Sequence, residues 1–158
     1  MPTIEIKTTL KADIEMCFDL ARNIDFHKAS LVHSKEKAVA GKTSGVIALG
    51  ESVTWEATHF CVKQRLTSKI TGFERPYYFV DDMISGAFKS FKHKHIFETQ
   101  IDRESNESYT LMTDVFEFES PLGILGKLAN VLFLKRYMKN LLTTRNAYLK
   151  IAAEQLTI

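Results

Sequence analysis

The stretch SPLGILGKLANVLFLKRYMKNLLTTRNAYLKIAAEQ, from Ser120 to Gln155, decides the fold. Ser120 and Pro121 form a helix-start signal, because serine caps free backbone N–H groups and proline fits the first helical position. Beyond Lys127 the polar residues recur with a helical period; they are Lys135, Arg136, Lys139, Asn140, Thr143, Asn146, Lys150 and Glu154. The apolar face between them contains Leu134, Tyr137, Met138, Leu141, Tyr148, Leu149 and Ala152. Such a helix runs roughly 40 Å, about the width of a small domain, so we expect the rest of the chain to wrap around it.

The chain before this helix is dominated by strand patterns. Thr3–Leu10 alternates as a first strand, Asp13 is the expected N-cap of a short helix containing Cys17, and a second short helix is expected over Ile24–Ala29. Further strands are expected at Ser34–Ala40, Glu51–Phe60, Val62–Phe73, Tyr77–Ile84, Phe88–Ile101 and Ser108–Phe118. The short connections favour an antiparallel meander. The expected fold class is therefore α+β, with one curved antiparallel sheet around one long helix in a single domain spanning residues 1–158.

The composition is that of an ordinary globular protein, with 45% hydrophobic and 25% charged residues. A net charge of +2 is too small to indicate nucleic acid or an anionic membrane as the main partner. The most apolar run, Pro121–Leu134, is interrupted by Lys127 and is shorter than the ~20 residues of a spanning helix, so no stable membrane insertion is expected. Two cysteines without metal-type spacing and an amino terminus without an apolar leader predict a cytoplasmic protein.

Three stretches carry a resemblance to a known family: GESVTWEATHF (Gly50–Phe60), FVDDMISGAFKSFKHKHIFE (Phe79–Glu98) and SPLGILGKLANVLFLKRYMKNLL (Ser120–Leu142). They resemble the START/polyketide-cyclase/birch-allergen superfamily, also called SRPBCC, and within it a bacterial cyclase-like subgroup. The resemblance covers nearly the whole chain and implies a helix-grip fold. It also implies a deep, mostly apolar cavity for a small hydrophobic molecule, as in carriers, sensors and a few enzymes. The chain departs from the subgroup at two expected turns, where Cys61 replaces glycine and Ala87 replaces proline.

The inner face of the sheet is predicted from hairpin turns at Phe60-Cys61, Gly86-Ala87 and Arg103-Glu104, because directly paired residues share a face. The expected pairs are Ala57 with Gln64, Trp55 with Leu66, Asp82 with Phe91, Val80 with His93, Phe91 with Phe116 and His93 with Asp114. The opposite face then collects Glu56, Lys63, Arg65, Lys69, Lys92 and Lys94. Lys92 and Lys94 therefore point away from the neighbouring aromatic residues, which argues against a nucleic-acid surface.

Six polar residues are expected on the inner face: His59, Gln64, Asp82, His93, His95 and Asp114. Buried polar groups must be paired or hydrated, and three interpretations remain open. They satisfy one another within the core, or they orient a ligand in an apolar cavity, or His93 and Asp114 act as a general base. His93 and His95, with Asp114 or His59 nearby, are also a candidate metal-ligand set, although two histidines alternating on a strand are common by chance.

The predicted function is the carrying or sensing of a small hydrophobic or lipid-like molecule in a cavity between the sheet and the long helix. The alternatives are a polyketide-cyclase- or isomerase-like enzyme using His93 and Asp114, and an interaction module with a vestigial cavity. The predicted ligand-binding residues are Trp55, His59, Gln64, Tyr78, Phe91, His93, His95, Met112, Asp114, Phe116, Leu134 and Met138. No metal or other cofactor and no nucleic acid is predicted, and a homodimer is left open. Pro121–Leu134 is a candidate entrance lid, because Gly123 and Gly126 weaken the helix there.

Overall fold

A computed structural model of the protein describes the backbone of residues 1–120 and 127–158 and the side chains of residues 1–120 and 131–158. The strands are β1 (Thr3–Leu10), β2 (Lys37–Gly41), β3 (Ser52–His59), β4 (Val62–Glu74), β5 (Tyr78–Ser85), β6 (Ser90–Ile101) and β7 (Ser108–Glu119). The helices are α1 (Ile14–Ala21), α2 (Ile24–Ser30), the 3-10 helix η1 (Val32–Ser34) and α3 (Lys127–Leu156). The predicted start signal of the long helix includes Pro121, which lies outside the described residues.

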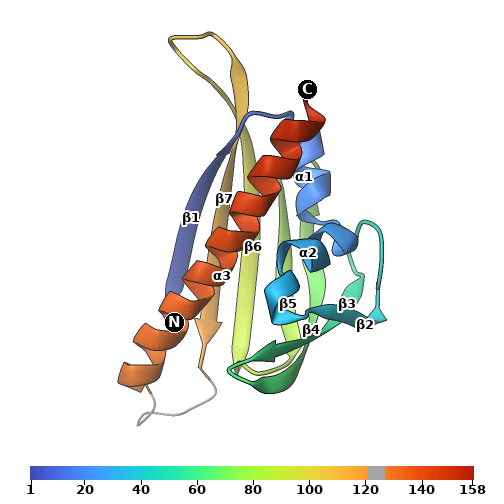
Figure 1. The fold of residues 1–158 in the computed structure, drawn as a ribbon, viewed down its shortest axis with the longest axis vertical. Coiled ribbons are helices and arrows are strands. Elements are labelled where there is room, and N and C mark those ends of the chain that lie inside the picture. Colours follow the sequence, from blue (N-terminus) through green and yellow to red (C-terminus); the bar gives the residue numbers. More distant parts are fainter. Residues whose placement is uncertain (121–126) are drawn as a thin grey trace.

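The described strands form one antiparallel sheet with the order β1-β7-β6-β5-β4-β3-β2. The helix α3 crosses one face of this curved sheet and contacts β1, α1 and α2 (Figure 1). This arrangement is the predicted α+β helix-grip fold, with a sheet that curves around a long C-terminal helix. Among the described residues, no helix combines the length and the apolar character that crossing a membrane requires.

Local sequence signals explain several element boundaries. The carboxylate of Asp13 accepts hydrogen bonds from the backbone N–H groups of Glu15 and Met16, as expected of an N-cap. Phe60 and Cys61 both have left-handed backbone conformations, with φ of 52° and 61°, which is the geometry of a two-residue hairpin turn. This turn gives the predicted β3–β4 register, in which Trp55 pairs with Leu66.

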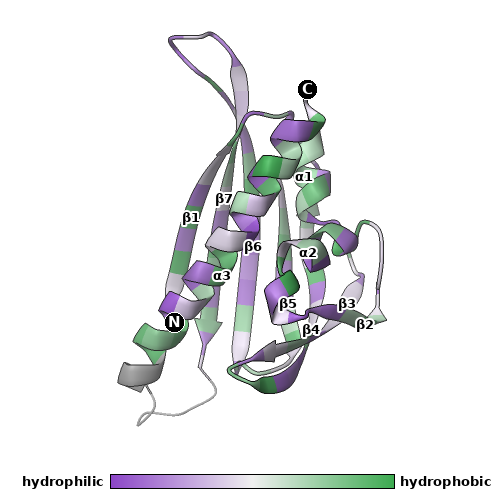
Figure 2. Cartoon of the chain, viewed as in Figure 1, coloured by the Kyte–Doolittle hydropathy of each residue, from purple (hydrophilic) through white to green (hydrophobic). Residues whose placement is uncertain are grey.

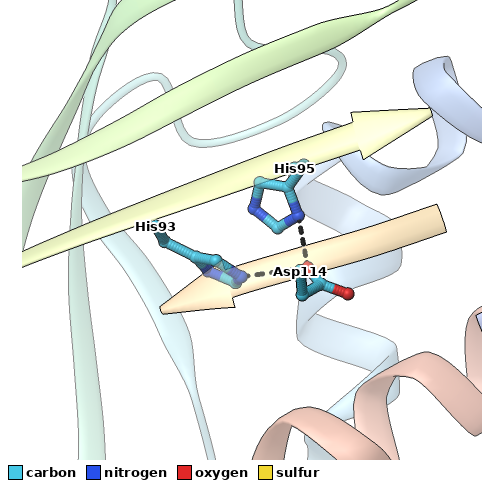
Figure 3. Close-up of side chains that lie close together, drawn as sticks. All are labelled: His93, His95 and Asp114. Carbon is cyan, nitrogen blue, oxygen red and sulfur yellow. Dashed lines mark hydrogen bonds and ion pairs between the residues drawn. The ribbon is translucent and has the colours of Figure 1, made fainter. Parts of the chain in front are cut away.

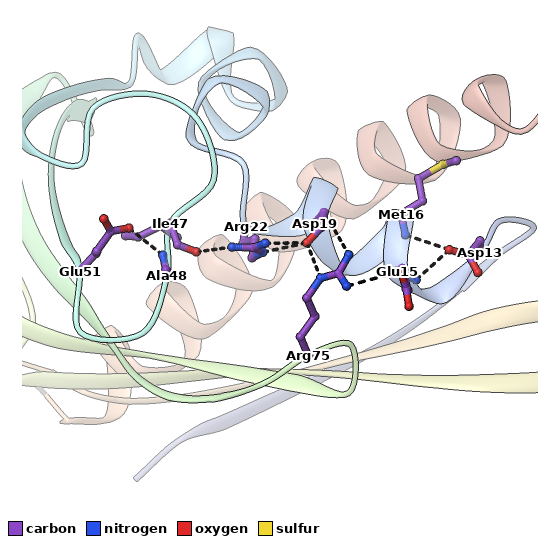
Figure 4. A network of polar contacts seen from close by, with 9 residues as sticks. All are labelled: Asp13, Glu15, Met16, Asp19, Arg22, Ile47, Ala48, Glu51 and Arg75. Carbon is purple, nitrogen blue, oxygen red and sulfur yellow. Dashed lines mark hydrogen bonds and ion pairs between the residues drawn. The ribbon is translucent and has the colours of Figure 1, made fainter.

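A polar network ties α1 to the loops at one end of the sheet (Figure 4). The carboxylate of Asp19 accepts hydrogen bonds from Arg22 and from Arg75, the residue that follows β4. The shortest hydrogen bond from each arginine is 2.7 Å long. Arg22 also donates to the backbone carbonyl of Ile47 at 2.9 Å. Because Arg22 spans from α1 to the loop before β3, the network fixes the position of α1 over the sheet.

The inside of the fold consists of two apolar layers with a polar layer between them. One apolar layer contains Phe18, Phe97, Met112 and Leu149, and the other contains Ile4, Phe91, Phe116, Phe118 and Leu142. On each contributing element the polar residues lie between these positions; together they are His93, His95, Asp114, Arg145 and Asn146. We call these five residues the polar layer. The hydropathy of α3 accordingly changes from turn to turn along its length (Figure 2).

The predicted face was wrong for one position on the sheet and for one position on the long helix. The β5–β6 connection spans residues 86–89, so Asp82 pairs with Lys92 and Asp81 pairs with His93. Asp81 therefore lies on the inner face, and Asp82 lies on the outer face, where it accepts a hydrogen bond from Thr71. Asn146, assigned to the polar face of the long helix, is only 2% exposed. In the β6–β7 hairpin, His93 pairs with Phe116, two residues from the expected partner Asp114. Because side chains alternate with a period of two, this shift leaves the predicted inner face of both strands unchanged.

Candidate functional site: an apolar cavity closed by a polar layer

The carboxylate of Asp114 is the centre of the polar layer. Asp114 on β7 lies directly opposite His95 on β6, so the two side chains share the inner face. One carboxylate oxygen, Oδ1, lies 2.9 Å from Nε2 of His93 and 2.7 Å from Nδ1 of His95 (Figure 3). The strands thus bring three polar side chains, which are 21 residues apart at most, into direct contact in the core.

The helix α3 closes the polar layer from the other side. Nδ2 of Asn146 donates a hydrogen bond of 2.6 Å to Oδ2 of Asp114. The guanidinium of Arg145 lies 3.7 Å from Oδ1 of Asp114 and donates to the backbone carbonyl of Ala21 at 2.9 Å. Arg145 is only 4% exposed, so its charge depends on Asp114 for compensation. The polar layer therefore connects the sheet, the long helix and the end of α1.

Burial and mutual contacts determine the protonation states of Asp114, His93 and His95 in the polar layer. Burial would raise the pKa of Asp114, but the imidazoles of His95 and His93 hold that pKa well below its usual range. Burial lowers the pKa of His93, and burial together with His93 lowers the pKa of His95 to about 3. Both rings are therefore neutral near pH 7, while Asp114 is ionised and can only accept hydrogen bonds. This assigns the ring hydrogens to Nε2 of His93 and Nδ1 of His95.

The same three side chains are also the candidate metal-ligand set. Potential ligand atoms of His93, His95 and Asp114 lie within 4.8 Å of one another. However, the two nitrogens that face Asp114 carry hydrogens, and the guanidinium of Arg145 lies 3.7 Å from the shared oxygen. A cation would have to displace these hydrogens beside a buried positive charge. The arrangement fits a hydrogen-bonded cluster better than a metal centre.

Next to the polar layer lies a cavity with two adjoining chambers. The inner chamber has a volume of about 150 Å³, and its wall includes Ile24, Trp55, Phe79, Asp81, His93 and Arg145. The outer chamber has a volume of about 380 Å³, and its wall includes Ala57, His59, Gln64, Phe133, Leu134 and Tyr137. Trp55, Leu66, Phe88 and Met138 line both chambers. Apolar walls with a small number of polar groups are typical of small-molecule sites.

Aromatic residues of the β3–β4 turn and of α3 meet at the outer chamber. The ring of Phe60 contacts the rings of Phe133 and Tyr137, at centroid distances of 5.4 Å and 4.5 Å. Nδ1 of His59 and the hydroxyl of Tyr137 are 2.6 Å apart, which joins β3 to α3 at this end. Of the predicted entrance lid, residues 121–126 lie outside the described residues, whereas Leu132 and Phe133 are exposed and Leu134 lines the outer chamber.

A second buried acid–base contact lies near the inner chamber. Oε2 of Glu36 lies 3.3 Å from Nε2 of His27, and the ring of His27 packs on Trp55 with a centroid distance of 4.4 Å. Burial would raise the pKa of Glu36, but His27 holds it below its usual value. This contact joins Glu36 to His27 on the side of the chamber that faces α2.

Most of the predicted ligand-binding residues lie on the cavity wall. Trp55, His59, Gln64, Phe91, His93, His95, Phe116, Leu134 and Met138 line one or both chambers. Met112 and Asp114 are completely buried and line neither chamber among the described residues. The prediction for Tyr78 was wrong, because the amino group of Lys94 lies 5.0 Å from its ring centroid on the outer face. Phe79 faces inward instead and stacks on His95 at a centroid distance of 4.2 Å.

Sequence reasoning missed several polar residues of this region, among them Asp81, Arg145 and Asn146. Asp81 was missed because the register of one hairpin was displaced by one residue. Asn146 was missed because it was assigned to the solvent-facing side of an amphipathic helix, and Arg145 was assigned to neither face of that helix. One signal was present: an inward carboxylate at Asp114 requires a buried cation or several donors, and the long helix is the element that could supply them.

The comparisons with known proteins agree with the fold. A START superfamily protein from Mycobacterium smegmatis is 12% identical, with a TM-score of 0.70 over 98% of this chain and 99% of that chain. A protein from Thermus thermophilus is 17% identical, with a TM-score of 0.71 over 96% and 99% of the two chains. Ginseng major latex-like protein 151 from Panax ginseng is 11% identical, with a TM-score of 0.65 over 96% and 97%. No family model and no curated protein matches the sequence. The chain thus has the helix-grip fold that START-like proteins share.

Proposed function

We propose that the protein binds a small apolar molecule in the two-chambered cavity beneath α3. The observation that carries this proposal is the mostly apolar cavity that ends at a polar layer whose hydrogen bonds are already formed. Apolar walls favour ligands in proportion to the apolar area that binding removes from water, about 25 cal/mol per Å². The predicted carrier or sensor function is compatible with this proposal, because neither function needs a chemical step.

Binding can be tested with the fluorescence of Trp55, the only tryptophan in the chain. Trp55 lines both chambers, so an uncharged apolar fluorophore such as N-phenyl-1-naphthylamine should quench its emission and fluoresce by energy transfer. Gln64→Phe places a large ring in the outer chamber, where Gln64 is half-buried. We expect this variant to weaken probe binding about tenfold or more. Overpacking a filled site costs about 1–3 kcal/mol, and about 1.4 kcal/mol is a tenfold change in the dissociation constant.

Thr58→Phe is the matched control, because Thr58 is exposed on the neighbouring strand β3 and alternates to the opposite face. It should bind the probe as the wild type does. Equal binding by both variants would place the probe outside the cavity. Solvent extraction of the purified protein, followed by mass spectrometry, should then identify the molecule that occupies the cavity. Failure of the wild type to bind any apolar probe would favour the interaction-module alternative.

A second candidate function is proton transfer by His93. The specific observation is that Nε2 of His93 donates to Asp114, which leaves Nδ1 as the acceptor nitrogen of a ring that lines the inner chamber. In this candidate, Nδ1 takes a proton from the carbon next to a ligand carbonyl, and Asp114 stabilises the imidazolium that forms. Asp114 touches no cavity surface and is a positioning residue.

The exchange of α-protons of 2-undecanone for deuterium in D₂O, followed by NMR, tests this second function. We expect the wild type to accelerate exchange over buffer and His93→Gln to abolish the acceleration, because glutamine lacks a basic nitrogen. The same ketone should still displace the naphthylamine probe from His93→Gln. Exchange at the buffer rate in the presence of the wild type would leave binding as the proposed function.

A further inference from the structure

Asp81 is an acid on the wall of the inner chamber without a hydrogen-bond partner at one oxygen. Asp81 pairs with His93 across the β5–β6 ladder and lines the same chamber. Its Oδ1 atom is shielded from solvent, and no described residue forms a hydrogen bond of good geometry with it. Oγ of Ser68, on the adjacent strand β4, is buried and likewise lacks such a partner among the described residues. The Ser68 hydroxyl is close enough to Asp81 to lower its pKa as a hydrogen-bond donor, but it brings no positive charge, so it does not compensate the charge of a carboxylate there.

The other ionisable groups around the inner chamber already have partners. Arg145 faces Asp114, Arg22 is 2.7 Å from Asp19, and His27 lies against Glu36. The imidazole of His93 is hydrogen-bonded to Asp114, and Nδ1 of His95 lies 2.7 Å from the same carboxylate oxygen. Among the described residues that line the chamber, Asp81 is therefore the acid whose charge has no direct counter-ion.

The surroundings of Asp81 make a donor group on a ligand more favourable than an acceptor group. Burial raises the pKa of Asp81 to about 7, and the neighbouring Asp82 adds to the rise, while the nearby Ser68 hydroxyl and Arg145 act in the opposite direction. The groups that face the chamber from other elements are His93 and His95 of β6, Arg145 of α3, Arg22 at the end of α1 and His27 of α2. An ammonium group beside Asp81 would pair with the carboxylate, whereas a ligand carboxylate would add a second negative charge.

We infer that the natural ligand is an apolar amine whose protonated amino group pairs with Asp81, while its apolar body extends along Trp55 and Met138 into the outer chamber. This inference rests on the proposed binding function and names the class of ligand. The amino group supplies the direct positive charge that Asp81 lacks among the described residues, beside the hydroxyl of Ser68. Arg145 does not prevent this pairing, because its charge is compensated by Asp114 at 3.7 Å.

Competition between ligands of equal chain length tests the inference. Decylamine, decanol and decanoate share one apolar chain and differ in the end group, so each is titrated against the bound naphthylamine probe, with Trp55 as the energy donor. At about pH 8 we expect decylamine to compete about tenfold better than decanol, because a hydrogen bond to a charged group contributes that factor or more. We expect decanoate to compete worst of the three. At about pH 5.5 the advantage of decylamine should shrink, because Asp81 is then protonated while the amine keeps its charge.

Two variants with the same change in charge separate Asp81 from the general charge of the protein. Asp81→Asn should remove the advantage of decylamine over decanol, whereas Asp82→Asn, on the outer face, should keep it. Equal competition by decylamine and decanol in the wild type, with the probe bound, would overturn the amine inference and leave the proposed binding function intact. An amine advantage that survives in Asp81→Asn would overturn the assignment to Asp81. Failure of the probe itself to bind would overturn both proposals.

Discussion

Replacing Asp114 with asparagine should lower the free energy of unfolding by about 3–5 kcal/mol, the cost of breaking a buried ion pair by removing one partner. Asp114 is completely buried, and Arg145 is only 4% exposed. The variant removes the nearest counter-ion of Arg145. It also places an amide where His93 and Asn146 form hydrogen bonds and where Nδ1 of His95 lies 2.7 Å away. Denaturation by urea, followed by Trp55 fluorescence and by circular dichroism, measures this loss.

The double variant Asp114→Asn with Arg145→Met distinguishes a charge effect from a general loss of packing. Arg145→Met alone should also be strongly destabilising, because it leaves the buried carboxylate without its cation. If the two charges depend on each other, the double variant should lose less stability than the sum of the single losses. Strict additivity, or single losses below about 1 kcal/mol, would show that the polar layer is not held by this pair.

Replacing Asp81 with asparagine should stabilise the protein near pH 8 by about 2–4 kcal/mol and have little effect near pH 4. The folded pKa of Asp81 is about 7, above its ordinary value of 3.8. Between these values the unfolded chain releases the proton and the folded chain keeps it, so the wild type loses stability as the pH rises. Asparagine does not ionise and therefore removes this loss. The size follows from about 1.4 kcal/mol for each pKa unit.

The measurement is the free energy of unfolding of the wild type and of Asp81→Asn at several pH values. The free energies of unfolding of the two proteins must be subtracted at each pH, because His95 changes stability with pH in the opposite direction to Asp81. Its folded pKa is lowered to about 3, so the stability that it contributes is lost as the pH falls below about 6.5. Asp82→Asn serves as the control for charge and should show a much smaller pH-dependent gain, because it removes only the minor contribution of Asp82 to the raised pKa of Asp81. A constant difference between wild type and Asp81→Asn from about pH 4 to pH 8 would contradict the raised pKa.

The sequence by itself determined the order of the elements and the helix-grip arrangement. The cap at Asp13 and the two-residue turn at Phe60-Cys61 depend only on neighbouring residues, so their geometry followed from the local sequence. The turn also determined which residues of β3 and β4 face inward, because the alternation of a strand continues from the first pair. Trp55 was placed on the inner face in this way, whereas Phe91, His93 and His95 were placed there because they alternate with Lys92 and Lys94 along β6.

Only the tertiary structure decided which polar residues surround the cavity. The longer β5–β6 connection shifted one register by a single residue, and because side chains alternate, it exchanged Asp82 for Asp81 and Tyr78 for Phe79 on the inner face. The burial of Arg145 depends on Asp114, which is 31 positions earlier in the chain and has no local signal on the helix. A polar residue on a helix is normally solvated, and only a partner brought near by the fold makes its burial favourable.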